Sequence, residues 1–313
     1  MQDILNAIEA AGIFPVVEID RLEDAVPVAE ALRKGGIAAM EITLRTPCAC
    51  DAIHAVRKAF PEMMVGAGTV LTPDQVEQAR DAGAGYMVSP GYNPRIVRYC
   101  LDAGILIIPG IDSPSGIELA IEAGLSVLKF FPAQFSGGID GLKSMAAPFK
   151  NRIRFLPLGG ITPENISDYV RCGEVLAVGG TWIAKNEIIR EGDFSRITQN
   201  AREAMALLHG FEFSGLELNV CGKNQDADLL DTLSRVFTLP RSGLTALRAL
   251  EDGDSNLSGK IRIACNNIKR GAMWLKNQSI QADTELVELE SKDETSVVLA
   301  GRPGGFRIQL IEK

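Results

Sequence analysis

The sequence predicts an α/β fold, a (β/α)8 TIM barrel followed by a smaller α+β domain. Eight short apolar runs rich in Val and Ile alternate with amphipathic segments that mostly end in Gly. The unit recurs at roughly 20 to 30 residues, which is enough for one strand and its return helix. The predicted strands are residues 13–19, 38–45, 63–70, 86–91, 106–111, 127–133, 154–161 and 175–182.

Several of the intervening segments open with a helix-capping residue before proline. Thr72, Asn93 and Ser113 each precede a Pro, which is typical of an N-cap and first helical turn. The eight strand-and-helix units within the first 210 or so residues match the eight units of a barrel. A doubly wound open sheet is the alternative, but neither GxGxxG nor GxxxxGK[ST] occurs in the chain.

The domain boundaries follow from a change of pattern near residue 209. Residues 1–208 form the predicted barrel, 209–214 a linker and 215–313 the second domain. That domain is expected to run β-α-β-α-β-β-β. Its predicted strands are 215–220, 260–267, 284–291, 295–301 and 305–313, and its predicted helices are 226–237 and 268–280.

Composition excludes several classes of partner. The 313 residues carry a net charge of −8, so the basic surface of a nucleic-acid-binding protein is missing. Two histidines and no Cys-x-x-Cys make a metal site a poor expectation. No apolar run is long enough to span a bilayer, and scattered cysteines are typical of reduced thiols. We therefore expect a soluble, cytoplasmic protein with no nucleic-acid or membrane partner.

The second predicted strand places charged residues on its interior face. Because side chains alternate along a strand, Glu41, Thr43 and Arg45 share one face, and the apolar residues between them face the helices. In a barrel, residues at the carboxyl ends of strands surround the active site. The other interpretation is an interior salt bridge without function.

The sixth predicted strand contains one lysine in an apolar run. The same alternation turns Lys129 and Phe131 inward if Leu128 and Phe130 pack under helices. An apolar setting favours the neutral amine, which attacks a carbonyl carbon. The alternative is a surface lysine that lays its stem over apolar neighbours.

Two glycine pairs end the seventh and eighth predicted strands. Gly159-Gly160 and Gly179-Gly180 allow backbone N–H groups to approach an anion, and these loops are the usual phosphate site of a barrel. Plain turns would explain the same pairs. The pattern favours a phosphorylated or carboxylated substrate tail.

In sequence, these residues resemble the family of 2-keto-3-deoxy-6-phosphogluconate (KDPG) and 4-hydroxy-2-oxoglutarate (KHG) aldolases. The resemblance covers about residues 3–208. It implies a class I aldolase that needs no metal or cofactor, forms a Schiff base with a 2-keto acid and is commonly a homotrimer. The matching motifs are EITLRT (41–46), GAGTV (66–70), SPG (89–91), KFFPA (129–133) and GGI (159–161).

The resemblance also implies roles for single residues. Lys129 would form the imine, and Glu41 would be the general acid and base. Arg45, helped by Thr69, would bind the carboxylate of the pyruvyl group. Phe131 would pack against the imine.

The rest of the expected substrate-binding set lines the pocket. Its members are Pro90, Gly159, Gly160, Gly179, Gly180 and Thr181.

The sequence departs from the family pattern at the distal end of the expected pocket. Leu158 stands where the phosphogluconate enzymes usually have Thr, Thr181 where Ser is common, and an arginine that some relatives have near Val17 is absent. These losses weaken the case for the sugar phosphate, whose cleavage belongs to the Entner–Doudoroff pathway. They strengthen the case for 4-hydroxy-2-oxoglutarate, so both substrates remain open.

The end of the chain resembles a glyoxalase-like, vicinal-oxygen-chelate module over about residues 215–313. The metal positions of such modules fall on Gly215, Lys260 and Gln309, which are poor ligands for that site. We expect a metal-free, non-catalytic domain for contacts or regulation, or a stabilising appendage.

Two other functions fit the barrel. A non-catalytic sugar-acid sensor would bind the ligand without turnover, and a phosphosugar isomerase would turn over without trapping pyruvate. The set of Glu41, Arg45 and Lys129 favours the aldolase, because a sensor needs no imine-forming lysine.

Overall fold

The computed structural model describes residues 1–218, 247–249, 259–277, 287–288, 295–298 and 306–313. The chain divides into two compact units, Met1–Leu208 and His209–Lys313.

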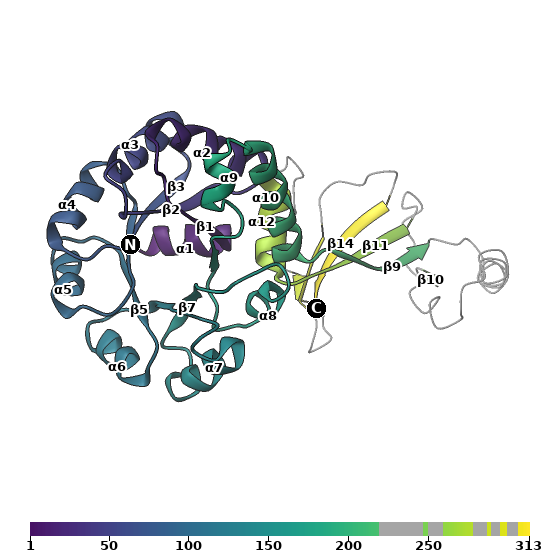
Figure 1. Ribbon diagram of the computed structural model, residues 1–313. Helices are drawn as coiled ribbons and strands as arrows, with labels where there is room; N and C mark the ends of the chain where they lie inside the picture. The colour runs from purple at the N-terminus through teal and green to yellow at the C-terminus, as the bar shows by residue number, and fades with distance from the viewer. Residues whose placement is uncertain (219–246, 250–258, 278–286, 289–294, 299–305) are drawn as a thin grey trace. The chain divides into compact units, whose positions relative to one another are not determined.

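The first unit is a barrel of eight parallel strands (Figure 1). The hydrogen-bonded order is β7-β6-β5-β4-β3-β2-β1-β8, so each strand lies beside its neighbour in sequence. A bridge between Phe155 and Val175, just before β8, closes the ring. This confirms the predicted barrel and excludes the doubly wound sheet. The strands are β1 Ile13–Val17, β2 Ala39–Thr43, β3 Met64–Gly68, β4 Tyr86–Ser89, β5 Ile107–Ile111, β6 Val127–Phe130, β7 Arg154–Pro157 and β8 Val178–Gly180.

Helices surround the barrel as the apolar periodicity predicts. The side chains of Thr72, Asn93 and Ser113 accept hydrogen bonds from the first turns of their helices, as expected of N-caps. The helices are α1 Gln2–Ala11, α2 Ala25–Lys34, α3 Ala49–Ala59, α4 Pro73–Asp81, α5 Pro94–Asp102, α6 Pro114–Glu122, α7 Gly138–Ala146, α8 Ile166–Val170, α9 Asn186–Arg190 and α10 Phe194–His209, with 3-10 turns at Leu22–Asp24 and Ala147–Phe149.

The first helix, α1, packs against the interior of the barrel. Ile8 is fully buried in the same apolar cluster as Phe14 and Tyr86, and Ile4 and Leu5 pack against that cluster. The rings of Phe14 and Tyr86 meet edge to face at 5.9 Å. Figure 1 shows α1 lying across the centre of the ring.

Every barrel strand except β5 ends at least two residues before the predicted end, and β5 ends at the predicted residue. The apolar run continues past the last ladder hydrogen bond into the loop. The residues beyond the strand ends are therefore free to turn over the carboxyl face, where barrel active sites form.

The second unit contains a six-stranded sheet in the order β10-β9-β11-β14-β13-β12. Helix α12 (Ile268–Asn277) precedes its last three strands. Cys265, Ile268 and Leu310 are the buried centre of one apolar cluster in this unit. The strands are β9 Glu212–Leu218, β10 Leu247–Ala249, β11 Gly259–Cys265, β12 Val287–Glu288, β13 Thr295–Val298 and β14 Phe306–Glu312.

Sequence reasoning gave no signal for the short strand β10. The predicted helix 226–237 lies outside the described residues. The predicted linker 209–214 is not a separate segment in the structure, because α10 ends at His209 and β9 begins at Glu212. Most of residues 209–214 therefore belong to the end of α10 or the start of β9.

Candidate active site

A cavity of about 120 Å³ opens at the carboxyl ends of the barrel strands. Its lining comes from the ends of β1, β2, β6 and β8 and from the loops after β3, β4 and β7. All eleven residues that the sequence nominates as catalytic or substrate-binding line it. They are Glu41, Arg45, Thr69, Pro90, Lys129, Phe131, Gly159, Gly160, Gly179, Gly180 and Thr181.

Strand β6 carries Lys129 into this cavity. The neighbouring Leu128 and Phe130 are fully buried on the other side of the strand, so the alternation predicted for this strand holds. The Lys129 side chain is 7% exposed, and its Nζ lies 4.8 Å from the centre of the Phe131 ring. Burying an ammonium group costs free energy unless a partner offsets it.

The partner of Lys129 is Glu41 on β2. Their Nζ and Oε1 atoms lie 3.8 Å apart, and the Glu41 side chain is 2% exposed. Glu41 Oε1 accepts no hydrogen bond within the described residues, and neither does Thr43 Oγ1 two residues on. The separation is longer than a hydrogen bond. The site therefore holds two reactive groups close together with hydrogen-bonding capacity left for a substrate or a water molecule.

The absence of a side chain at Gly68 leaves room for the Glu41 carboxylate beside Lys129. A Cβ at Gly68 of β3 would lie 2.1 Å from Glu41 Oε1, so any side chain there would push the carboxylate away. Tyr86, the first residue of β4, is fully buried. Burial raises the pKa of the Tyr86 hydroxyl well above its usual range, and the nearby Glu41 carboxylate raises it further. This phenol therefore stays neutral.

Arg45 lies at the rim of the cavity. The alternation along β2 predicts an interior position, but β2 ends at Thr43 and the chain then turns outward. The Arg45 side chain lines the cavity and is nevertheless 57% exposed. Its Nη1 donates to Glu18 Oε2 at 3.4 Å. A guanidinium at a mouth is well placed to receive an incoming carboxylate.

Thr69 and Pro90 follow the ends of β3 and β4. Thr69 has a φ of 59°, a left-handed conformation that few non-glycine residues adopt. Such conformations are concentrated at functional sites. The loop of Pro90 comes close to β5 because Gly110 has no side chain, since a Cβ there would lie 2.1 Å from the Pro90 carbonyl oxygen.

The far side of the cavity is built from glycine and apolar side chains. Gly159 and Gly160 have φ values of 91° and 80°, which only glycine adopts readily. Leu158 is 3% exposed and packs on Gly179, where a Cβ would lie 2.6 Å from Leu158 Cγ. This wall offers backbone N–H groups to a ligand and no hydroxyl at position 158.

Sequence reasoning missed two lining residues, Val16 and Ile161, and the rim carboxylate Glu18. Alternation along β1 could have found Val16, whereas Glu18 lies just past Val17, the last residue of that strand. Within the described residues, no group of His, Cys, Asp and Glu side chains is placed to hold a metal ion. No helix of the described residues is long and apolar enough to cross a bilayer.

Together, the fold and the cavity define a class of barrel enzyme in which a buried lysine faces a buried carboxylate at the mouth. A family model described as KDPG and KHG aldolase matches residues 4–200, which is more than half of the chain. The protein belongs to this aldolase family and is a lyase.

The relatives in this family match the first unit over nearly their whole length. The chain is 46% identical over 208 residues to the 2-dehydro-3-deoxy-phosphogluconate aldolase of Treponema pallidum, covering 66% of this chain and 99% of the relative. It is 44% identical over 193 residues to the KHG/KDPG aldolase of Escherichia coli K12, covering 62% and 90%.

Solved structures give the same family. The 2-keto-3-deoxy-6-phosphogluconate aldolase of Zymomonas mobilis ZM4, determined with 3-phosphoglycerate, matches with a TM-score of 0.62 at 40% identity, over 66% of this chain and 97% of its own. The KDPG aldolase of Legionella pneumophila holds pyruvate as a covalent carbinolamine. It matches with a TM-score of 0.61 at 39% identity, over 63% and 96%.

Proposed function

We propose that this protein cleaves a 4-hydroxy-2-keto acid to pyruvate and an aldehyde through a Schiff base on Lys129. The observation that carries the proposal is the pair of Lys129 Nζ and Glu41 Oε1, 3.8 Å apart and more than nine-tenths buried at the carboxyl end of the barrel. An amine beside a carboxylate that takes and returns its proton is the arrangement that imine chemistry needs.

The reaction begins when Lys129 passes a proton to Glu41 and the resulting neutral amine attacks C2 of the substrate. The carbinolamine loses its oxygen as water, with Glu41 supplying the proton through a water molecule, and an iminium forms. Glu41 then takes the proton of the C4 hydroxyl. The C3–C4 bond breaks, its electron pair moves to the iminium nitrogen, and the aldehyde leaves. The remaining enamine takes a proton at C3, and hydrolysis releases pyruvate from Lys129.

The other lining residues orient the reacting half. Arg45, with Thr69, binds the carboxylate at C1. Phe131 packs against the imine, which its position 4.8 Å from Lys129 Nζ supports. Pro90 lines the pocket beside them. Holding the carboxylate fixes C2 in reach of the amine, which is the largest contribution that positioning makes to such a step.

The distal half of the substrate lies against Thr181 and the glycine pairs at 159–160 and 179–180. The candidates are 2-keto-3-deoxy-6-phosphogluconate, which gives glyceraldehyde 3-phosphate, and 4-hydroxy-2-oxoglutarate, which gives glyoxylate. Cleavage of the first would place the enzyme in the Entner–Doudoroff pathway. Leu158, which brings no hydroxyl to this wall, supports the second.

Borohydride trapping tests the mechanism. The protein is incubated with pyruvate and borohydride, and its intact mass is measured. We expect one reduced pyruvate per chain in the wild type and none in Lys129→Met. An adduct that survives Lys129→Met, or the absence of any adduct in the wild type, would overturn the proposal.

Coupled pyruvate release from the two acids tests substrate choice. If the phosphorylated acid is preferred by more than about a hundredfold, equal to about 2.7 kcal/mol of transition-state binding, the inference from Leu158 is wrong. Comparable values of kcat/KM for the two acids would support a dual activity.

We also propose that the chain works as a homotrimer in the cytoplasm. The resemblance to this family implies a trimer, and Phe135, in the loop after β6, is 95% exposed and available to a partner subunit. The five cysteines described are all free thiols, which suits a reducing compartment. Light scattering on the wild type and on Phe135→Ser tests the assembly, and a monomeric wild type would contradict it.

For the second unit we propose a non-catalytic role in contacts or regulation, in a glyoxalase-like module spanning residues 215–313. Gln309, at one of the metal positions that the resemblance implies, instead donates to Ser296 Oγ at 2.8 Å. The cavity draws its lining from residues 16–181 alone. A chain that ends after Leu208 should therefore still trap pyruvate, and loss of trapping in a folded truncated chain would assign the second unit a part in the chemistry.

A further inference from the structure

Glu18 is the first residue after β1, the strand that lies between β2 and β8 in the barrel. Val16, near the end of β1, lines the cavity, and Glu18 follows two residues later, just past the last strand residue. In the barrel, Val16 pairs with Glu41 of β2, so Glu18 lies at about the level of Thr43, nearer the mouth than the reacting pair. On its other side β1 pairs with β8, where Pro15 lies opposite Gly180.

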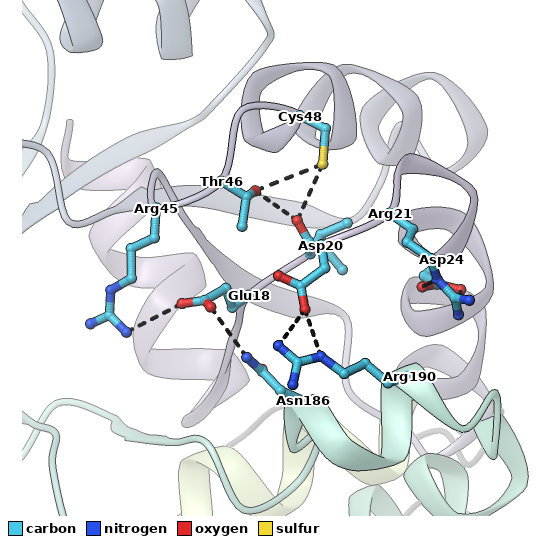
Figure 2. A network of polar contacts seen from close by, with 10 residues as sticks. Glu18, Asp20, Arg21, Asp24, Arg45, Thr46, Cys48, Asn186 and Arg190 are labelled. Atoms are coloured by element: carbon cyan, nitrogen blue, oxygen red, sulfur yellow. Dashed lines mark hydrogen bonds and ion pairs between the residues drawn. The ribbon is translucent and has the colours of Figure 1, made fainter.

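Two groups hold the Glu18 carboxylate over the mouth (Figure 2). Arg45 Nη1 donates to Oε2 at 3.4 Å, and Asn186 Nδ2 donates to Oε1 at 3.3 Å. Asn186 opens α9, which follows Gly180 at the end of β8 and Thr181 in the next loop. The carboxylate thus bridges the reacting side of the mouth and its distal side.

The two residues that follow Glu18 are held by contacts from two neighbouring segments. Thr46 Oγ1 and Cys48 Sγ donate to the Ile19 carbonyl oxygen at 2.6 and 3.2 Å, and Arg190 of α9 pairs with Asp20 at 2.8 Å (Figure 2). These contacts come from the β2–α3 loop and from the helix after β8. The position of Glu18 is therefore set by the fold as well as by its own side chain, which is 24% exposed.

The charged side chains at the mouth of the cavity already have partners of opposite charge. Among the described lining residues, the charged side chains are Glu41, Arg45 and Lys129. Lys129 already faces Glu41, and Arg45 already has Glu18 as a partner. A substrate with a carboxylate at C1 and a dianionic phosphate at its far end meets one rim guanidinium and one rim carboxylate. Like charges brought together at a binding site discriminate against the more highly charged ligand.

We infer that Glu18 determines specificity by disfavouring a dianionic distal group. The substrate class is then a 4-hydroxy-2-keto acid whose far end is uncharged or carries a single negative charge. This inference rests on the proposed aldolase function. It gives a function to the Glu18 carboxylate, which the reaction at Lys129 does not require.

A pair of acids that differ only by the phosphate tests the inference. The value of kcat/KM is measured for 2-keto-3-deoxy-6-phosphogluconate and for 2-keto-3-deoxygluconate, in the wild type and in Glu18→Gln. We expect the ratio of phosphorylated to unphosphorylated acid to rise about tenfold, equal to about 1.4 kcal/mol. Gln keeps the size of the side chain and its capacity to contact Asn186.

Asp20→Asn is the matched control, because Asp20 lies on the same segment and pairs with Arg190 instead of Arg45. Its ratio should change less than about twofold. A change below about threefold in Glu18→Gln, or an equal change in Asp20→Asn, overturns the inference. Pyruvate trapping by borohydride in both variants confirms that the lysine site is intact.

A binding measurement separates this inference from the proposed reaction. Calorimetry with 3-phosphoglycerate and glycerate compares the same two charges without turnover. Glu18→Gln should tighten the phosphorylated ligand alone. If the wild type traps no pyruvate, the proposed function fails, and the calorimetric ratio alone then confirms or overturns the charge preference.

Discussion

Two buried titratable groups in this protein have very different surroundings. Lys129 faces Glu41 in a cavity open at the barrel mouth. In the second unit, the ring of His209 is 2% exposed, stacks on Phe211 at 5.2 Å between ring centres and lies 5.1 Å from the ring of Trp274. Neither ring nitrogen of His209 has a hydrogen-bond partner within the described residues.

The difference shows what makes a buried group reactive. Burial lowers the pKa of His209 to about 4, with a further contribution from the positive charge of Arg270. The imidazole therefore stays neutral and behaves as part of an aromatic cluster. Lys129 has a carboxylate partner and open space in front of it, and that access makes a site. Each prediction below tests one side of this contrast.

The largest effect is expected for Glu41→Gln. Loss of the acid–base group should lower kcat about 10³-fold, because neither dehydration of the carbinolamine nor removal of the C4 proton has its catalyst. Coupled pyruvate release measures it. Glu62→Gln removes an exposed acid that pairs with Arg33 and should leave kcat unchanged. A kcat near the wild-type value in Glu41→Gln would remove Glu41 from the mechanism.

The second-largest loss of kcat is expected for Gly68→Ala. The added Cβ would lie 2.1 Å from Glu41 Oε1 and must displace the carboxylate from Lys129. A displacement of about 1 Å costs on the order of a hundredfold in rate. Gly173→Ala is the control, since nothing lies within 4 Å of its added Cβ. Equal kcat in the two variants would show that the position of Glu41 is not critical.

Leu158→Thr probes the distal wall of the same cavity. A hydroxyl at this position should raise kcat/KM for the phosphorylated acid about tenfold relative to 4-hydroxy-2-oxoglutarate, through one added hydrogen bond of about 1.4 kcal/mol. Ile161→Val reduces volume on the same wall without a hydroxyl, so it separates space from polarity. An unchanged preference in Leu158→Thr would contradict the role given to Leu158.

His209 should affect stability and leave activity unchanged. Between its folded pKa of about 4 and its ordinary value of 6.5, the unfolded chain binds a proton that the folded chain does not. Stability is therefore lost as the pH falls below 6.5, by about 2 kcal/mol at pH 5. His209→Phe should abolish this loss and keep kcat. Urea unfolding at pH 7 and pH 5, followed by Trp274 fluorescence in a Trp182→Phe background, measures it.

The barrel could be predicted because its signals are local. Eight Val- and Ile-rich runs and the caps at Thr72, Asn93 and Ser113 each depend on neighbours in sequence. The inward positions of Glu41 and Lys129 could also be predicted, because side chains alternate along their strands. Arg45 shows the limit of that reasoning, since alternation fails once the strand has ended.

The rim could not be predicted in the same way. Glu18 meets Asn186, 168 residues later in the chain, and only closure of the barrel between β8 and β1 brings them together. Similarly, Gly68 is required because of Glu41 on the next strand. Contacts of this kind depend on strand register, which a single sequence does not state.

Helix α1 has a consequence for the order of events in the reaction. Ile8 packs with Phe14 and Tyr86 near the starts of β1 and β4, whereas the cavity opens at the carboxyl ends, so in the proposed reaction the aldehyde would leave by the mouth through which the keto acid entered. In the proposed reaction, water would reach the iminium on Lys129 by the same route. The proposed mechanism makes product release sequential, with pyruvate last, because pyruvate stays bound to Lys129 until hydrolysis and the aldehyde would clear the opening first.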